Sequence, residues 1–118
     1  MRLYFVETDL FTTRITKLGL EGDLVRLQDR LLENPEIGDT DAGTGGLRKV
    51  RISDRARGQG KRGGARVHYL WMPGHAVLYL IFVYGKDERE SLTTADKKRM
   101  KAVVEMIKAA WDSRSPER

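Results

Sequence analysis

The sequence predicts one α+β domain with the element order β-α-α-β-β-β-α, in which an antiparallel meander packs against helices. Three observations support this prediction. Apolar residues recur at helical spacing in the first third of the chain and again near its end, and three segments between them have the character of strands. Short links join those three segments, so neighbouring strands should run antiparallel. The 118 residues are expected to form a single domain, residues 1–118, with one core.

The first third of the chain predicts a strand and two helices. The short apolar run Leu3–Val6 is typical of a strand. Helical spacing predicts one helix before Gly19 and a second after it, and Asn34-Pro35 ends the second helix because proline disfavours helix in the residue before it. The positions that carry this spacing are Leu10, Phe11, Ile15 and Leu18, then Leu24, Leu27, Leu31 and Leu32.

A glycine-rich loop, Gly38–Gly46, precedes the three predicted meander strands. These strands are Leu47–Ile52, Ala65–Met72 and Ala76–Tyr84, and a flexible stretch, Arg57–Gly64, joins the first two. The last strand is apolar at almost every position, which indicates burial on both faces and a central place in the sheet.

The end of the chain predicts a helix. Thr93, with Asp96 three residues later, forms an imperfect capping box at its start. An apolar stripe at helical spacing follows and is expected to pack on the core: Met100, Val103, Val104, Ile107 and Trp111. The polar tail, Asp112–Arg118, is expected to fray.

Positive charge is concentrated in the segment Arg48–Arg66. It holds eight basic residues and one acid, Asp54, for a net charge of +7, whereas the whole chain carries +5 and the remainder therefore −2. Such a local excess favours a polyanionic partner, and nucleic acid is the preferred interpretation. The alternative is a solubilising surface with a mobile hairpin loop.

Strand periodicity divides this basic segment into two parts. Lys49 and Arg51 share one face of their strand, and Arg66 and His68 share one face of the next. If the two strands pair, both sets can line one side of the sheet, although like charges opposed there are destabilising. Four of the other cations lie on or beside the glycine-rich link, where they are expected to bind RNA rather than to act at the scissile bond: Arg55, Arg57, Lys61 and Arg62.

Cleavage of RNA requires a base for the 2′-hydroxyl, stabilisation of the phosphorane and a proton for the 5′ oxygen. Arginine and lysine can stabilise the developing charge, and one such donor is worth roughly 3–4 kcal/mol of barrier. Proton transfer could fall to His68, or to a lysine whose neutral form is favoured by crowding from other cations. The structural alternative for His68 is a half-buried strand residue, and His75 is expected to be a solvated loop residue.

Other classes of chemistry are disfavoured. There is no cysteine, and two isolated histidines offer no metal-ligand spacing, so we expect no metal and no cofactor. The string Gly58–Gly63 matches a dinucleotide fingerprint, but a strand rather than a helix follows it. No apolar run is long enough for a signal peptide or a membrane span, so we expect a cytoplasmic protein with no membrane partner.

Four strings together resemble the RelE/HigB toxins of type II toxin–antitoxin systems, in the RelE/ParE superfamily, and the HigB-like branch most closely. The resemblance extends over residues 2–110. It implies the compact RelE-like fold and a metal-independent mRNA endoribonuclease that cuts translated mRNA in the ribosomal A site and so inhibits translation. The strings are Asn34-Pro35-Glu36, Gly43-Thr44-Gly45-Gly46-Leu47-Arg48-Lys49-Val50-Arg51, Gly60-Lys61-Arg62-Gly63-Gly64-Ala65-Arg66-Val67-His68-Tyr69 and Tyr84-Gly85-Lys86-Asp87-Glu88.

The resemblance also implies roles for particular residues. Arg51 and Arg66 would stabilise charge on the scissile phosphate, and Lys49 or Lys86 would transfer protons. Some RelE members carry a catalytic tyrosine after the final strand, and residues 90–94 contain none. Either His68 or a lysine then acts as the base, or activity rests on placement by the ribosome. The expected contacts to RNA or the ribosome come from Arg48, Arg55, Arg57, Lys61, Arg62 and Arg89.

The partners implied by the resemblance are the ribosome, mRNA and a cognate antitoxin, expected to be a helix-turn-helix protein similar to HigA. Two other functions remain open. One is a ParE-like inhibitor of DNA gyrase, which has the same fold, although the dense basic face argues against it. The other is a non-catalytic RNA- or ribosome-binding protein, which would keep the charge but tolerate single substitutions.

Overall fold

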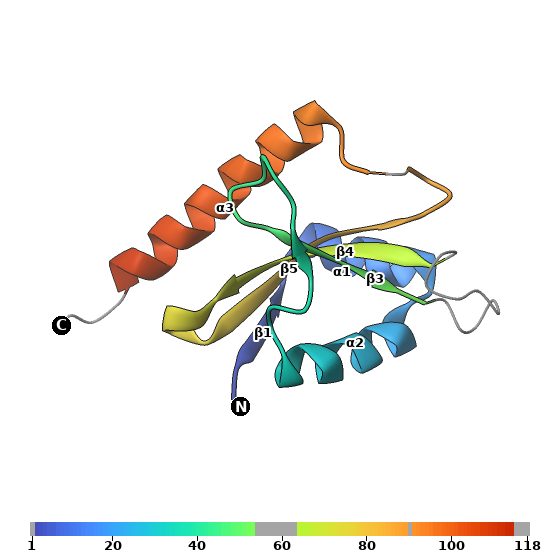
Figure 1. The fold of residues 1–118 in the computed structure, drawn as a ribbon, viewed down its shortest axis with the longest axis horizontal. Helices are drawn as coiled ribbons and strands as arrows, with labels where there is room; N and C mark the ends of the chain where they lie inside the picture. Colours follow the sequence, from blue (N-terminus) through green and yellow to red (C-terminus); the bar gives the residue numbers. More distant parts are fainter. Residues whose placement is uncertain (1, 54–63, 90, 115–118) are drawn as a thin grey trace.

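The computed structural model describes residues 2–53, 64–89 and 91–114, and in them a single sheet is covered by helices on both faces (Figure 1). The α+β fold class and the predicted order of elements are confirmed, with one added short strand, β2. The elements are β1 (Tyr4–Glu7), α1 (Asp9–Leu18), α2 (Glu21–Glu33), β2 (Asp39–Thr40), β3 (Arg48–Ile52), β4 (Ala65–Met72), the 3-10 turn η2 (Pro73–His75), β5 (Val77–Gly85) and α3 (Thr94–Arg114).

The described strands form a sheet in the order β1-β5-β4-β3-β2. β3, β4 and β5 pair antiparallel as the predicted meander, and β1 adds to β5 in parallel. β5 is therefore an interior strand, as its apolar sequence predicts, while β4 holds the middle position. β2 pairs only with Lys49 and Arg48 of β3, so the rest of the β3 edge is open within the described residues.

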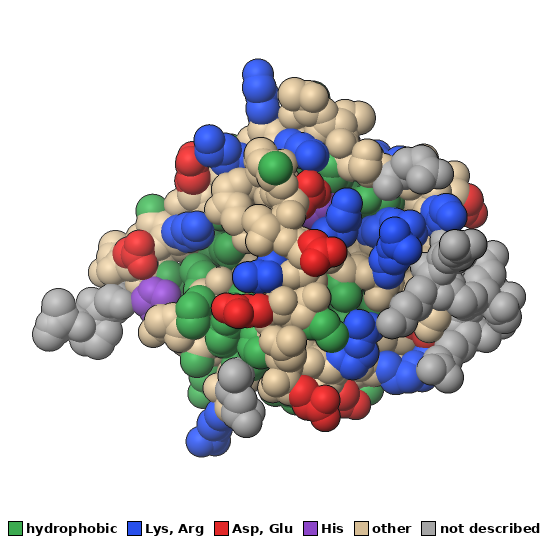
Figure 2. Space-filling view, viewed as in Figure 1, with side chains coloured by type: hydrophobic (Ala, Val, Ile, Leu, Met, Phe, Trp, Pro, Cys, Tyr) green, Lys and Arg blue, Asp and Glu red, His purple; other side chains and the backbone are tan. Residues whose placement is uncertain are grey.

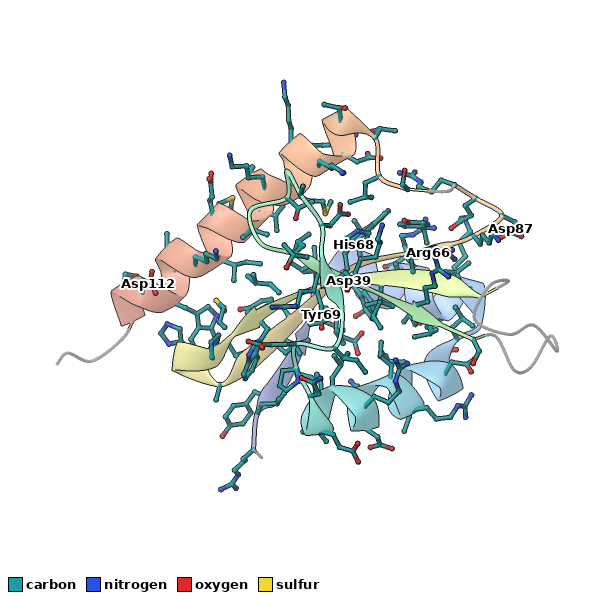
Figure 3. The ribbon with its side chains drawn as sticks, in the orientation of Figure 1. Asp39, Arg66, His68, Tyr69, Asp87 and Asp112 are labelled. Carbon is teal, nitrogen blue, oxygen red and sulfur yellow. The ribbon has the colours of Figure 1, made fainter. Side chains whose placement is uncertain are left out.

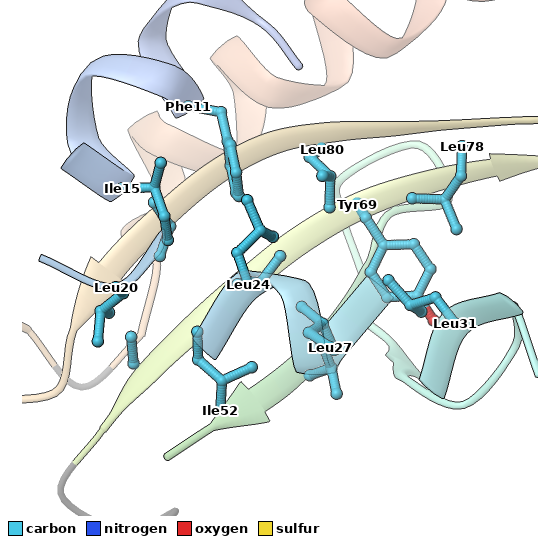
Figure 4. Close-up of a cluster of buried hydrophobic side chains, with 14 residues drawn as sticks. Phe11, Ile15, Leu20, Leu24, Leu27, Leu31, Ile52, Tyr69, Leu78 and Leu80 are labelled. Carbon is cyan, nitrogen blue, oxygen red and sulfur yellow. The ribbon is translucent and has the colours of Figure 1, made fainter. Parts of the chain in front are cut away.

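Helices α1 and α2 cover one face of the sheet. Their apolar stripes pack on the inward residues of β3, β4 and β5, and each fully buried leucine or phenylalanine contributes about 1.5–3 kcal/mol. Figure 4 shows this cluster, with Tyr69 between the sheet and the end of α2. Its members include Phe11, Ile15, Leu24, Leu27, Leu31, Val50, Ile52, Val67, Tyr69, Leu78 and Leu80.

Helix α3 covers the opposite face through the predicted apolar stripe. Thr93 and Asp96 form the expected capping box, because each side chain accepts a hydrogen bond from the backbone of the other. The second core cluster joins α3 to the sheet and includes Leu47, Leu70, Met72, Ile81, Tyr84, Met100 and Val104.

Two expectations about the polar ends of these elements are wrong. Helix α3 continues through Asp112 to Arg114, so the frayed tail does not begin at Asp112, and residues 115–118 lie outside the described part. His75 is not a solvated loop residue: it lies in η2, its ring centroid is 5.3 Å from that of Trp111, and its Nε2 is 3.3 Å from Asp112. The helix end therefore packs on the β4–β5 turn.

Candidate nucleic-acid interface

Three predicted cations meet at the open edge of β3, and we call Lys49, Arg51 and Arg66 the cation cluster. Arg51 faces Arg66 across the β3–β4 ladder, and Lys49 faces His68. The cluster lines a concavity of about 470 Å³, here called the β3 concavity, that extends toward the end of α2. Figure 2 shows lysine and arginine side chains gathered on this part of the surface. The strand periodicity therefore correctly placed the three cations together.

The cation cluster has no ion-pair partner among the described residues. Within the described part of the chain, no carboxylate forms an ion pair with any of its members, whereas Arg14, Arg26, Arg89 and Arg99 each pair with an acid. Arg66 is only 7% exposed, and its Nη1 has no hydrogen-bond partner among the described residues. An unsatisfied buried polar group costs about 1–3 kcal/mol, and a charged one more. Such a site can regain that free energy by binding an anion.

His68 is buried and does not reach this surface, although it follows Arg66 by two residues on β4 (both are labelled in Figure 3). Its side chain is 0% exposed and stacks on Tyr84 with ring centroids 5.8 Å apart. Its Nε2 is 2.8 Å from Oδ2 of Asp41, while its Nδ1 has no hydrogen-bond partner among the described residues. The expectation that His68 lines an accessible face with Arg66 is thus wrong, because α3 and the loop before β3 cover that part of β4. In this conformation His68 cannot touch a substrate.

Asp41 joins the sheet to α3, and sequence reasoning did not single it out. One carboxylate oxygen faces His68, and the other lies 3.2 Å from Nζ of Lys97. Burial alone would raise the pKa of Asp41. The hydrogen bonds from His68 and Lys97 outweigh this effect of burial and hold the pKa of Asp41 below the ordinary value of an aspartate. Burial lowers the pKa of His68, which the bond to Asp41 only partly offsets, so the neutral imidazole is favoured.

The glycine-rich loop between β2 and β3 is what brings Asp41 into place, and it reaches α3 in Figure 1. Gly43 and Gly45 have φ of +83° and +79°, a left-handed conformation that side chains rarely adopt. The Thr44 hydroxyl donates to the Asp41 carbonyl at 2.6 Å and accepts from Leu47 N–H at 3.1 Å. The Gly-Thr-Gly-Gly string thus closes a loop against α3, and the glycines that flank Thr44 were the sequence signal for it.

The other predicted site residues are spread around the cluster. The backbone N–H of Lys86 donates to Gly64 at 3.0 Å, so Lys86 follows β5 at the end of the sheet where β4 begins. Arg48 lies on the opposite face of β3 and donates to the carbonyl of Gly38 at 2.7 Å. Arg89 pairs with Asp96 and lies over the rings of Phe82 and Tyr84. Arg55, Arg57, Lys61 and Arg62 lie outside the described residues.

The described residues contain no group of three or more His, Cys, Asp or Glu side chains placed to hold a metal ion. Their helices include none with the length and apolar character needed to cross a membrane.

Comparison with known proteins places the fold. No model of a known protein family matches the chain. Among solved structures, it is similar to the toxin RelE of E. coli, in the free state of a variant with two arginines replaced by alanine. The fold is RelE-like. The TM-score is 0.54 and the identity 20%, over 76% of this chain and 90% of that chain. This likeness confirms the RelE-like architecture and does not distinguish a HigB-like branch within it.

Proposed function

We propose that this protein is the toxin of a type II toxin–antitoxin system and that it cleaves translated mRNA in the ribosomal A site. The observation that carries the proposal is the cation cluster, three cations without acidic partners in the described structure, one of them a largely buried guanidinium. The RelE-like fold supports the same function, because the similar structure is that of a toxin. The HigB-like branch, and a helix-turn-helix antitoxin similar to HigA, are part of this proposal.

In the proposed reaction the 2′-oxygen of a nucleotide attacks the adjacent phosphorus. The 2′-hydroxyl loses its proton, the bond to the 5′ oxygen breaks, and that oxygen gains a proton, which leaves a cyclic phosphate and a 5′-hydroxyl. Arg66 and Arg51 stabilise the charge on the phosphoryl oxygens, in place of a metal ion or cofactor. Lys49 or Lys86 transfers the protons. His68, held by Asp41, supports the strand opposite Lys49 and does not touch RNA.

The ribosome has a defined part in this proposal. The β3 concavity has a volume of about 470 Å³, which suits one nucleotide, and the ribosome would hold the rest of the message. The A site would present a single nucleotide in the geometry that in-line attack needs. Arg55, Arg57, Lys61, Arg62, Arg48 and Arg89 are proposed to contact RNA or the ribosome, and the proposed compartment is the cytoplasm.

The test maps new 5′ ends of mRNA after induction of the protein, with and without active translation. Wild type should produce cuts that require translation, and Arg66→Ala should reduce them about 10²- to 10³-fold, the usual effect of one charge-stabilising donor. Arg66→Met keeps most of the side-chain volume without the charge, so it separates loss of the guanidinium from loss of packing. Lys98→Ala is the matched control, because Lys98 is exposed on α3 and away from the β3 concavity.

Other outcomes would contradict the proposal in distinct ways. Full cleavage by both Arg66 variants removes Arg66 from catalysis, and cuts on naked RNA remove the ribosome from the mechanism. Intact mRNA with failing DNA supercoiling would identify a gyrase inhibitor. Arrested translation without cuts, unchanged by single substitutions, would identify a non-catalytic RNA- or ribosome-binding protein.

A further inference from the structure

The β3 concavity contains one group that phosphate binding does not require. Asp39 on β2 lines it, opposite Lys49 in the β2–β3 ladder and beside the cation cluster (Figure 3). Its side chain is exposed and takes part in no hydrogen bond or ion pair with the described residues. An ionised carboxylate only accepts hydrogen bonds and repels phosphate. Its place here therefore points to a part of the ligand that donates hydrogen bonds.

The rest of the lining suits a nucleobase. Ile37 is 38% exposed and supplies an apolar surface to the lining of the β3 concavity. Arg30 from α2 lines the same space. Unstacked bases pack on guanidinium planes and apolar surfaces, which lets a protein hold a base by its faces and read its edge. The volume of about 470 Å³ lies in the range of small-ligand sites.

We propose that the β3 concavity is a nucleotide subsite that prefers guanine. This rests on the proposed function, because the nucleotide is the one next to the scissile phosphate. Arg51 and Arg66 bind its phosphate, Arg30 and Ile37 contact the faces of the base, and Asp39 accepts hydrogen bonds from its Watson–Crick edge. Guanine alone presents two adjacent donors there, N1–H and the N2 amino group, which match the two oxygens of one carboxylate. Adenine, cytosine and uracil each present one donor beside an acceptor.

The substitution Asp39→Asn should change the preferred base rather than abolish binding. An amide offers one acceptor and one donor, which match the amino group and ring nitrogen of adenine. Purified wild-type protein, titrated calorimetrically with GMP and AMP, should bind GMP about 5- to 150-fold more tightly, the range of one bidentate contact to a base edge. Asp39→Asn should lose or reverse this ratio. Glu36→Gln, which removes an exposed acid outside the β3 concavity, should keep it.

The same variants, mapped for cleavage in cells, separate this inference from the proposed function. Enrichment of guanine beside wild-type cuts, replaced by adenine in Asp39→Asn, supports both. Cuts without a base preference, or with a preference that Asp39→Asn leaves unchanged, would contradict the guanine subsite but would still support the proposed nuclease activity. A GMP preference that depends on Asp39, found in a protein that makes no cuts, supports the subsite and overturns the nuclease. Equal binding of GMP and AMP by wild type overturns the subsite.

Discussion

Tyr69 connects the core to the loop between α2 and β2, immediately before Asp39, and its hydroxyl group provides the sharpest stability test. The hydroxyl donates to the carbonyl of Pro35 at 2.8 Å and accepts from Gly38 N–H at 2.9 Å, and Tyr69 is 0% exposed. Burial raises the pKa of Tyr69, so the group stays protonated at neutral pH and keeps its donor role. Tyr69→Phe preserves the ring and leaves both backbone groups without a partner.

The expected loss follows from those two groups. Each buried backbone group left unsatisfied costs about 1–3 kcal/mol, so Tyr69→Phe should lower the free energy of unfolding by about 2–6 kcal/mol. That is a large share of the 5–15 kcal/mol typical of a domain, and it corresponds to a fall in Tm of about 10–25 °C. Urea denaturation followed by circular dichroism measures it. Tyr4→Phe is the control, because Tyr4 is 70% exposed. A loss below about 0.5 kcal/mol would show that the hydroxyl bridge does not hold the loop.

Two more stability predictions concern backbone crowding and pH. A Cβ on Gly64 would lie 1.9 Å from the carbonyl oxygen of Ile52, so Gly64→Ala should lower the urea midpoint strongly, whereas Gly74→Ala, with nothing within 4 Å, should change it little. Equal effects of the two substitutions would contradict the close approach of β3 and β4. Burial lowers the pKa of His68 in the folded protein, so the unfolded chain takes up a proton on this histidine first as the pH falls. The free energy of unfolding should therefore decrease below about pH 6.5, the ordinary pKa of a histidine. His68→Gln should flatten this dependence, measured as urea midpoints between pH 7.5 and 5, and an unchanged slope would contradict it.

The elements were predictable where local pattern and tertiary environment agree. The α3 capping box and apolar stripe are local in sequence, and β5 is apolar throughout because it is buried on both faces. Other features depend on distant residues. The pairing of β1 with β5 joins two strands that are separated in sequence by two α-helices, three strands and η2, and β2 is too short to leave a pattern. His75 is held by α3, which no local window contains.

The cation cluster could be foreseen because a strand repeats every two residues. That period placed Lys49 and Arg51 on one face and required Arg66 to meet them once β3 and β4 pair. The same argument failed for His68, because periodicity assigns a face and does not say what covers it. The residues that complete the candidate site, Asp39 and Arg30, come from segments whose sequences carry no nucleic-acid signal.

The sequence by itself determined the fold class, the order of elements and the gathering of positive charge on the β3–β4 hairpin. All three depend on periodicity and composition, which are properties of neighbouring residues. Tertiary structure alone decided which polar residues of β3 and β4 are accessible. Helix α3 and the glycine-rich loop bury His68 against Asp41, and the short β2 leaves the β3 edge open. Burial depends on long-range packing, so the same alternating pattern places Arg66 at the lining of the β3 concavity and a fully covered histidine two residues away.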